Sequence, residues 1–179
     1  MSKKVLVISS SLRNNANSEQ LAVSFSDGAK AAGHDVEIVS MRGKEVKFCI
    51  GCFACQKTKR CFMHDDADAI REKMLHADVL VFATPIYYYE MSGTLKTMLD
   101  RANPLFVSDY RFREVYALAT AAEDEEYVPQ RAFSGIEGWV DCFEKAKLDG
   151  TLFCGGVTDT GEINGNAKLQ EAYQLGTKV

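Results

Sequence analysis

Hydrophobic and polar positions follow two different periods along the chain, and stretches of each period alternate. Val5–Ile8 and Val79–Ala83 are apolar throughout, which is typical of strands buried on both faces of a parallel sheet. Asp35–Ser40 alternates polar and apolar residues, which predicts a half-exposed strand at a sheet edge. Glu114–Ala121 and Thr151–Val157 complete a predicted set of five strands.

Segments with helical spacing separate these strands. The first helix is predicted to begin near Asn17 and Ser18, two candidate N-caps, and to stop at Gly33. Further helices are predicted over Asp65–His76, Gly93–Arg101, Gln130–Asp149 and Ala167–Leu175. Because strands and helices alternate, we expect one α/β domain over residues 1–179, with a five-stranded parallel sheet and helices on both faces.

In such sheets, ligands bind outside the carboxyl ends of the strands. The loop after Ile8 carries hydroxyl groups and one guanidinium, and it leads into a helix whose first N–H groups lack partners. That combination suits a phosphate group. The chain has neither G-x-G-x-x-G nor G-x-x-x-x-G-K-[ST], so a Rossmann fingerprint and a Walker loop are unsupported. The alternative is an ordinary polar turn between strand and helix.

Thr84–Gly93 (TPIYYYEMSG) leaves the third predicted strand at the same edge of the sheet. Pro85 stiffens the exit, and Tyr87–Tyr89 supply flat apolar surfaces that suit a planar ring ligand. Successive residues of an extended segment point to opposite sides, so at most two of these tyrosines can face one ring. The alternative is that they pack on a neighbouring helix or on a partner subunit.

Four cysteines lie in the loop Arg42–Met63 with the spacing C-x₂-C-x₂-C-x₅-C, at Cys49, Cys52, Cys55 and Cys61. A tight run of three thiolates suits a cube of iron and sulfide better than one tetrahedral zinc. Free thiols and a redox disulfide are the alternatives. Cys142, in a predicted helix, and Cys154, in a predicted strand, are expected to be core residues.

Composition narrows the possible functions. Apolar residues make up 46% and charged residues 26% of the chain, and the net charge is −4, so the basic surface that nucleic-acid binding requires is absent. No apolar run reaches the length of a membrane span. Six cysteines without a signal sequence predict a reducing, cytoplasmic location.

Two motifs resemble those of a known family. SSSLRNNANSEQL resembles the pattern G-S-P-R-x-x-G-N-[ST]-x-x-L of the NAD(P)H-dependent FMN reductase family. TPIYYYEMSGTLKTMLDR is similar to its second motif, P-x-Y-x-x-x-x-[SP]-x-x-L-K-x-x-x-D-R, and GGVTDTGEINGN resembles its closing segment. Ser10, Leu12 and Ala16 depart from the first pattern, and the Ser10 side chain is expected to narrow the space beside the phosphate loop. The cysteine motif resembles that of the iron-sulfur flavoproteins, a branch of the same superfamily.

The resemblance implies a flavodoxin-like fold with strand order 2-1-3-4-5 and bound FMN. It implies a phosphate site formed by Ser9, Ser11, Arg13, Asn17 and Ser18. Pro85, Ile86, Tyr87 and Tyr88 should border the ring, with Thr120 and Ala121 nearby. It further implies an oxidoreductase that passes hydride from NAD(P)H to the flavin and on to a quinone, another flavin or another small acceptor, in a homodimer or higher homo-oligomer. No side chain is expected to act as a catalytic acid or base.

Two other functions stay open at this point. One is an electron carrier of the iron-sulfur flavoprotein type, with a [4Fe-4S] cluster on Cys49, Cys52, Cys55 and Cys61. The other is a redox-sensing binding module that uses the same thiols as a switch.

Overall fold

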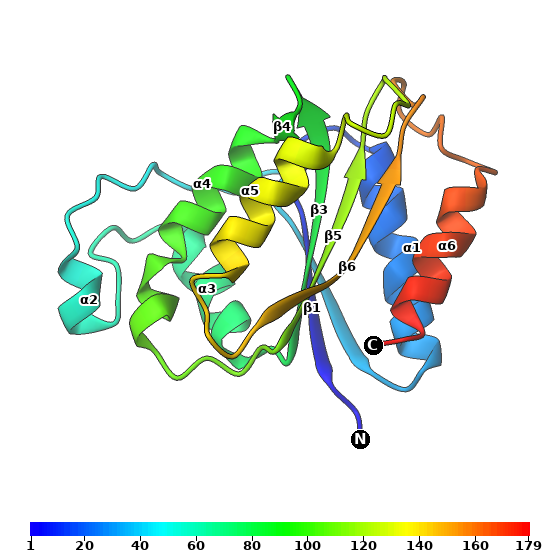
Figure 1. The fold of residues 1–179 in the computed structure, drawn as a ribbon. Helices are drawn as coiled ribbons and strands as arrows, with labels where there is room; N and C mark the ends of the chain where they lie inside the picture. Colours follow the sequence, from blue (N-terminus) through cyan, green and yellow to red (C-terminus); the bar gives the residue numbers. More distant parts are fainter.

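A computed structural model describes all residues, 1–179, and has the parallel sheet that the sequence predicts. Five parallel strands run in the order β2-β1-β3-β5-β6, so the predicted order 2-1-3-4-5 is confirmed (Figure 1). The strands are β1 (Lys4–Ser9), β2 (Asp35–Ser40), β3 (Val79–Tyr87), β5 (Glu114–Thr120) and β6 (Lys147–Cys154). A two-residue strand, β4 (Glu90–Met91), pairs antiparallel with the end of β3 and was not predicted.

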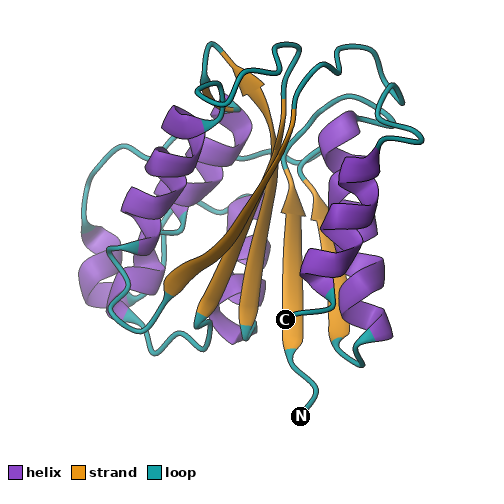
Figure 2. Ribbon diagram, turned by 45° about the vertical axis from the view of Figure 1, so that its right-hand side comes forward, coloured by secondary structure: helices purple, strands orange, loops and turns teal.

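Helices cover both faces of the sheet, as Figure 2 shows. One face carries α1 (Asn17–Ala31) and α6 (Ala167–Gly176), which pack against each other. The other face carries α3 (Asp66–His76), α4 (Gly93–Arg101) and α5 (Gln130–Val140). A short helix α2 (Ala54–Thr58) and the 3₁₀ helix η1 (Asn103–Val107) lie together at one end of the molecule. None of these helices combines the length and apolar character needed to cross a bilayer.

The central strands contribute alternate side chains to two separate cores. Leu6 and Ile8 of β1 pack in the core beneath α3, α4 and α5. Val5 and Val7 of the same strand pack in the core beneath α1 and α6. Since both faces are covered, β1 has no solvent side, which explains why its sequence is apolar without alternation.

Two glycines allow α1 and α6 to approach closely. A Cβ added to Gly28 would lie 2.0 Å from the backbone oxygen of Tyr173, and one added to Gly176 would lie 2.1 Å from that of Phe25. No side chain fits at either position, so the contact between these helices is made by backbone. The contact brings the C-terminal helix alongside the first helix of the chain.

Local signals predicted several helix ends correctly. Gly33 follows α1 with a φ of 91°, and α4 has the predicted bounds Gly93–Arg101. The Ser92 hydroxyl caps α4 by accepting a hydrogen bond from the Leu95 N–H. The prediction of Asn17 or Ser18 as the N-cap of α1 is wrong, because Ala16 holds that position without a side-chain hydrogen bond. The Asn17 and Ser18 side chains are used elsewhere, as described below.

The predicted helix Gln130–Asp149 is too long. Helix α5 ends at Val140, and β6 already begins at Lys147, earlier than the predicted start at Thr151. Phe143 caused the error, because it is buried in the core from a turn rather than from a helix. Cys142, expected in the core, is exposed, whereas Cys154 is buried as expected.

Candidate functional site

A cleft opens where β1, β3 and β5 end. Its cavity volume is about 180 Å³. The register of the sheet sets Pro85 of β3 opposite Thr120 of β5, so the two strand exits form neighbouring walls. All the residues predicted to bind FMN line this cleft except Ser9 and Tyr88. The lining predicted residues are Ser11, Arg13, Asn17, Ser18, Pro85, Ile86, Tyr87, Thr120 and Ala121.

The phosphate end of the cleft contains a buried hydroxyl group without a partner. Ser18 lies in the first turn of α1, is almost completely buried, and its Oγ has no hydrogen-bond partner. The N–H groups of this first turn have no acceptor within the helix. Buried polar groups are nearly always paired, so an unpaired hydroxyl beside free N–H groups indicates a site for an acceptor such as phosphate.

Arg13 projects over the same end of the cleft. Its Nη1 donates to the backbone oxygen of Thr158 at 2.6 Å, and it forms no ion pair. Its backbone oxygen accepts a hydrogen bond from Arg42 Nη1 at 2.9 Å. The position of the loop is thus fixed from two sides, while the charge of Arg13 is left without a counter-ion.

The Asn17 side chain joins the start of α1 to the loop before α6. Its Nδ2 donates to the Asp159 oxygen at 2.9 Å, and its Oδ1 accepts from the Ile163 N–H at 3.2 Å. The amide is therefore occupied within the protein. Only the backbone N–H of Asn17 is left to face a phosphate.

Two serines before the loop point elsewhere. Ser10 Oγ lies 3.0 Å from the Ala83 oxygen, to which it donates, and 2.9 Å from Ser92 Oγ, from which it accepts. The expectation that Ser10 narrows the phosphate loop is therefore wrong, because this side chain faces the start of α4. Ser9 is buried with an unpartnered Oγ but does not line the cleft.

At the ring end, a tight hairpin carries the tyrosines. Tyr88 and Tyr89 join β3 to β4 with φ angles of 51° and 67°, a left-handed geometry that bulky residues rarely adopt. Tyr88 is 97% exposed at the tip and lies outside the cleft, contrary to its predicted place beside the ring. The Tyr89 hydroxyl donates to Glu123 at 3.0 Å, and this carboxylate raises the pKa of Tyr89. Of the three tyrosines, Tyr87 lines the cleft.

The far wall of the cleft joins two distant parts of the chain. The Ala121 oxygen accepts from the Val157 N–H at 3.0 Å, and the Ala121 N–H donates to the Cys154 oxygen at 3.2 Å. Both polar backbone groups of Ala121 are thus bonded within the protein. This residue contributes surface and shape to the wall.

The four cysteines of the predicted motif line a second and much smaller pocket, of about 20 Å³, beside α2 and η1. Cys55 is buried, and its Sγ accepts a hydrogen bond from Asn103 Nδ2 at 3.2 Å. Burial raises the pKa of the Cys55 thiol, which the Asn103 hydrogen bond acts to lower. All six cysteines are free thiols, and no three ligating side chains are arranged to hold a single metal ion.

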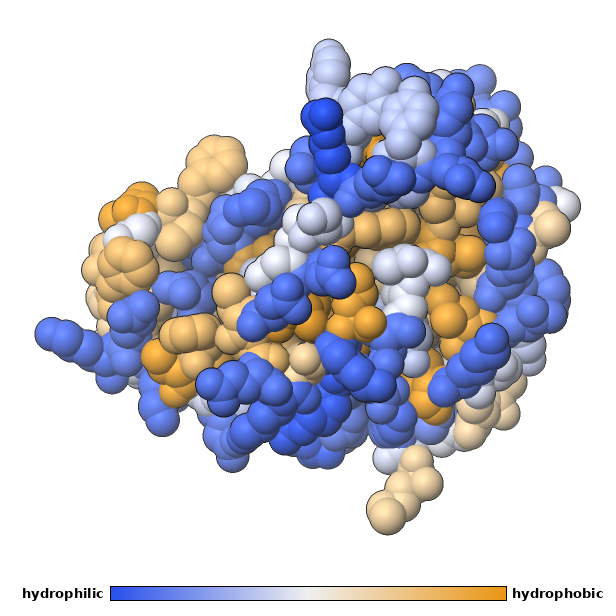
Figure 3. Space-filling model, viewed as in Figure 1, coloured by the Kyte–Doolittle hydropathy of each residue, from blue (hydrophilic) through white to orange (hydrophobic).

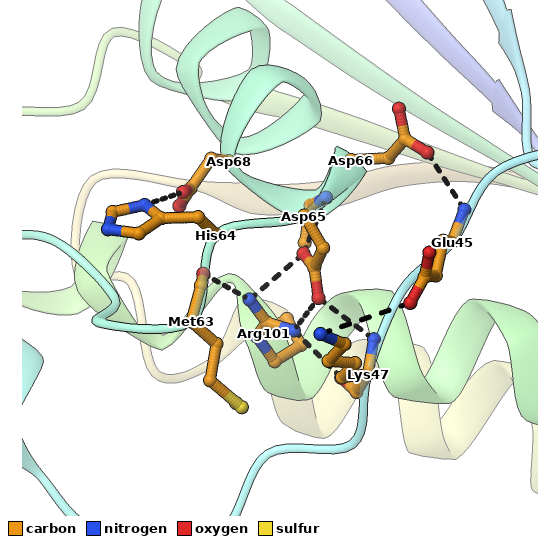
Figure 4. A network of polar contacts seen from close by, with 9 residues as sticks. Glu45, Lys47, Met63, His64, Asp65, Asp66, Asp68 and Arg101 are labelled. Carbon is orange, nitrogen blue, oxygen red and sulfur yellow. Dashed lines mark hydrogen bonds and ion pairs between the residues drawn. The ribbon is translucent and has the colours of Figure 1, made fainter.

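Arg101 contacts both flanks of the cysteine segment, residues 48–62, which carries these four cysteines (Figure 4). Its guanidinium forms a buried two-pronged ion pair with Asp65, at 2.6 and 3.0 Å. It also donates to the backbone oxygens of Lys47 and Met63, at 2.9 and 3.1 Å. The sequence motif carried no sign of this contact, because Arg101 lies forty residues beyond Cys61 and only packing brings them together.

Comparison with known proteins agrees with this geometry. The family described as NADPH-dependent FMN reductase matches residues 3–127. An iron-sulfur flavoprotein of Methanocaldococcus jannaschii is 35% identical over 98% of this chain and 95% of its own. An iron-sulfur flavoprotein of Methanosarcina thermophila is 27% identical over 87% of this chain and 82% of its own.

Solved structures show the same fold. An NAD(P)H:quinone oxidoreductase from Methanothermobacter marburgensis superposes with a TM-score of 0.75 at 17% identity, covering 99% of this chain and 96% of that one. An azoreductase from Bacillus anthracis gives 0.74 at 18% identity, with all of both chains covered. Since the family match spans well over half of the sequence, the chain belongs to the NADPH-dependent FMN reductase family and is an NAD(P)H-dependent flavin oxidoreductase.

Proposed function

We propose that the cleft holds FMN, with the phosphate at the first turn of α1 and the ring between the exits of β3 and β5. Ser11, Arg13 and Ser18 would bind the phosphate. Pro85, Ile86, Tyr87, Thr120 and Ala121 would border the ring. The observation that carries this proposal is the buried Ser18 hydroxyl, which has no partner in the protein and lies beside free helix N–H groups.

FMN supplies hydride and single-electron transfer when bound. The chain's own residues hold and orient it and exclude water from one side. NAD(P)H is the electron donor of the family, and we propose a quinone, an azo compound or another flavin as acceptor. The names of the structurally similar quinone oxidoreductase and azoreductase support this class of acceptor.

The phosphate site is tested by comparing FMN with riboflavin, which lacks the phosphate. Ser18→Ala should weaken FMN binding roughly 10- to 100-fold, since a hydrogen bond to a charged group contributes about 1.5–3 kcal/mol. Riboflavin binding should be unchanged. Ser26→Ala is the matched control, because Ser26 is buried in the same helix but bonded to Ala22. Equal loss of both ligands, or of neither, contradicts the placement.

A second candidate is an electron carrier in which Cys49, Cys52, Cys55 and Cys61 hold a [4Fe-4S] cluster. Two observations favour it: the four cysteines line one pocket, and the relative at 35% identity is named an iron-sulfur flavoprotein. Four thiols around one pocket are the donor set that such clusters use. The cluster would supply one-electron transfer.

Iron analysis of anaerobically purified protein tests the cluster. The wild type should contain about four iron atoms per chain and absorb broadly near 400 nm (roughly, for this class of cluster). Cys52→Ser should lose the iron, whereas Cys142→Ser, an exposed thiol outside this pocket, should keep it. An iron-free wild type after anaerobic reconstitution removes the cluster and leaves the thiol switch to be tested by reversible oxidation.

Turnover separates the enzyme from the carrier. Rapid oxidation of NADH or NADPH with a quinone supports a reductase that uses small acceptors. Reduction by ferredoxin or dithionite alone supports a carrier. The measurement uses FMN-loaded protein with its iron content known, so that an inactive preparation is not mistaken for a carrier.

We also propose that copies of this chain associate. Exposed apolar side chains gather around the cysteine segment and η1, at the end of the molecule that carries α2 (Figure 3). Each is more than half exposed: Phe48, Ile50, Phe53, Phe62 and Phe106. Monomers rarely expose such a group. The double variant Phe48→Ser/Phe106→Ser should shift the mass measured by light scattering toward the monomer, whereas Val23→Ser on α1 should not.

A further inference from the structure

Arg101 holds both ends of the cysteine segment with one side chain. Its guanidinium donates to the oxygen of Lys47, just before the segment, and to that of Met63, just after it. Asp65 accepts from both terminal nitrogens of Arg101 and also from the N–H groups of Lys47 and Ala67. These contacts fix where the segment starts and ends relative to α4 (Figure 4).

One donor of Arg101 is not used by these contacts. The Nε–H is buried without a partner, in a side chain that is 1% exposed. Arg101 lines the pocket that contains the four cysteines. An arginine guanidinium stays protonated in proteins, and the Asp65 carboxylate pairs with this one.

A second donor enters the same pocket two residues later. Asn103, at the start of η1, also lines it and donates its Nδ2 to Cys55 Sγ at 3.2 Å. The turn from α4 into η1 therefore brings one cation to the pocket wall and one amide to the Cys55 sulfur. The rest of the wall is apolar, with Ile50, Phe53, Phe62, Met63 and Pro104, apart from Asp100, which forms an ion pair with Lys96 at 2.6 Å.

We propose that Arg101 and Asn103 are positioning residues for the sulfur-ligated cluster, and that their N–H groups raise its reduction potential. This inference rests on the proposed [4Fe-4S] cluster. A reduced cluster carries one more negative charge than an oxidised one, so donors and a cation beside its sulfur atoms stabilise the reduced form more. Hydrogen bonds to sulfur and local charge are recognised determinants of cluster potential.

The variants Asn103→Ala and Arg101→Gln test the proposal, with Arg71→Gln as control. Arg71 is also a buried arginine with an unpartnered Nε, but it lies on α3 and does not line the pocket. The cluster potential is measured by redox titration followed through the electron paramagnetic resonance of the reduced cluster. Both pocket variants should shift the potential to lower values, and Asn103→Asp should shift it further, because a carboxylate replaces the donor.

The outcomes separate this inference from the proposed function. Wild-type protein that contains no iron after anaerobic reconstitution overturns the cluster and this inference together. Wild type with a cluster, and pocket variants that keep their iron at an unchanged potential, overturn the inference alone. If Arg101→Gln does not fold, as judged by circular dichroism and FMN binding, the Asn103 series decides.

Discussion

The side-chain oxygen of Asn17 accepts a hydrogen bond from the buried backbone N–H of Ile163, 146 positions further along the chain. The amide nitrogen of the same side chain donates to Asp159. The start of α1, where the phosphate is proposed to bind, is thus joined to the segment before α6. The stability of the segment before α6 and the affinity for FMN should therefore both depend on Asn17.

Asn17→Ala should destabilise the protein even without FMN. It leaves the Ile163 N–H without an acceptor, which costs about 1–3 kcal/mol. For a chain of this size, each kcal/mol corresponds to a fall of about 2–4 °C in melting temperature. Thermal unfolding of FMN-free protein checks this, with Asn14→Ala in the exposed part of the loop as control. A variant as stable as wild type would show that the two Asn17 side-chain hydrogen bonds do not contribute to stability.

Arg13→Ala should weaken FMN binding roughly 10- to 100-fold, because a charge-assisted contact to phosphate contributes about 1.5–3 kcal/mol. Fluorescence titration with FMN and riboflavin measures it, and the riboflavin affinity should not change. Arg60→Ala, which removes an exposed arginine near α2, should leave both affinities as they are. Unchanged FMN affinity in Arg13→Ala would remove Arg13 from the site.

Gly28→Ala should be strongly destabilising, by about 1–3 kcal/mol or more, because the new methyl group would overlap the backbone of α6. Gly138→Ala in α5 is the matched control, since nothing lies within 4 Å of its Cβ position. That change should stabilise the helix by about 0.5–1 kcal/mol. Urea unfolding of the two variants should give opposite signs, and the same sign in both would contradict the close helix contact.

Asp65 should make the protein sensitive to acid. Burial acts to raise the pKa of Asp65, but the hydrogen bonds from Arg101 and from the Lys47 and Ala67 N–H groups lower it below its ordinary value of 3.8. A carboxyl with a lowered folded-state pKa adds stability above its unfolded-state pKa, and this stability is lost as the pH falls through the folded-state value.

The melting temperature of wild type should therefore fall steeply as the pH drops below about 4. Asp65→Asn should be less stable at neutral pH, because it leaves the buried Arg101 charge unpaired, and should show a shallower acid slope. Asp109→Asn, in an exposed ion pair, serves as the comparison. Parallel slopes for Asp65→Asn and wild type would show that this carboxyl does not set the acid limit.

The parallel sheet could be predicted from the residue pattern because buried strands have a simple sequence signature, whereas the strand order was implied by the family resemblance. Val5–Ile8 and Val79–Ala83 have no polar position, which is typical of parallel strands covered on both faces. No comparable sequence pattern predicts the hairpin formed by the end of β3 and β4. Its turn places Tyr88 and Tyr89 in a left-handed conformation for which sequence preference indicates glycine or asparagine.

Residues within one loop were easier to predict than residues that meet through folding. The spacing of the cysteines indicated a common site, and they do line one pocket. Arg101 and Asn103 could not be assigned to it, because their positions depend on how α4 packs beside α3. At Asn17 the local signal was misleading. A polar residue at a helix start suggested an N-cap, but its side chain forms hydrogen bonds with Asp159 and Ile163 in a distant loop.

The walls of the cleft come from opposite ends of the chain. Ser11 and Ser18 lie in the loop before α1 and at its start, whereas Val157 and Thr158 follow β6 and are held in place by hydrogen bonds with Ala121 and Arg13. A fragment that stops before Val157 therefore lacks one wall of the cleft, however well its sheet forms, and should not assemble the complete pocket.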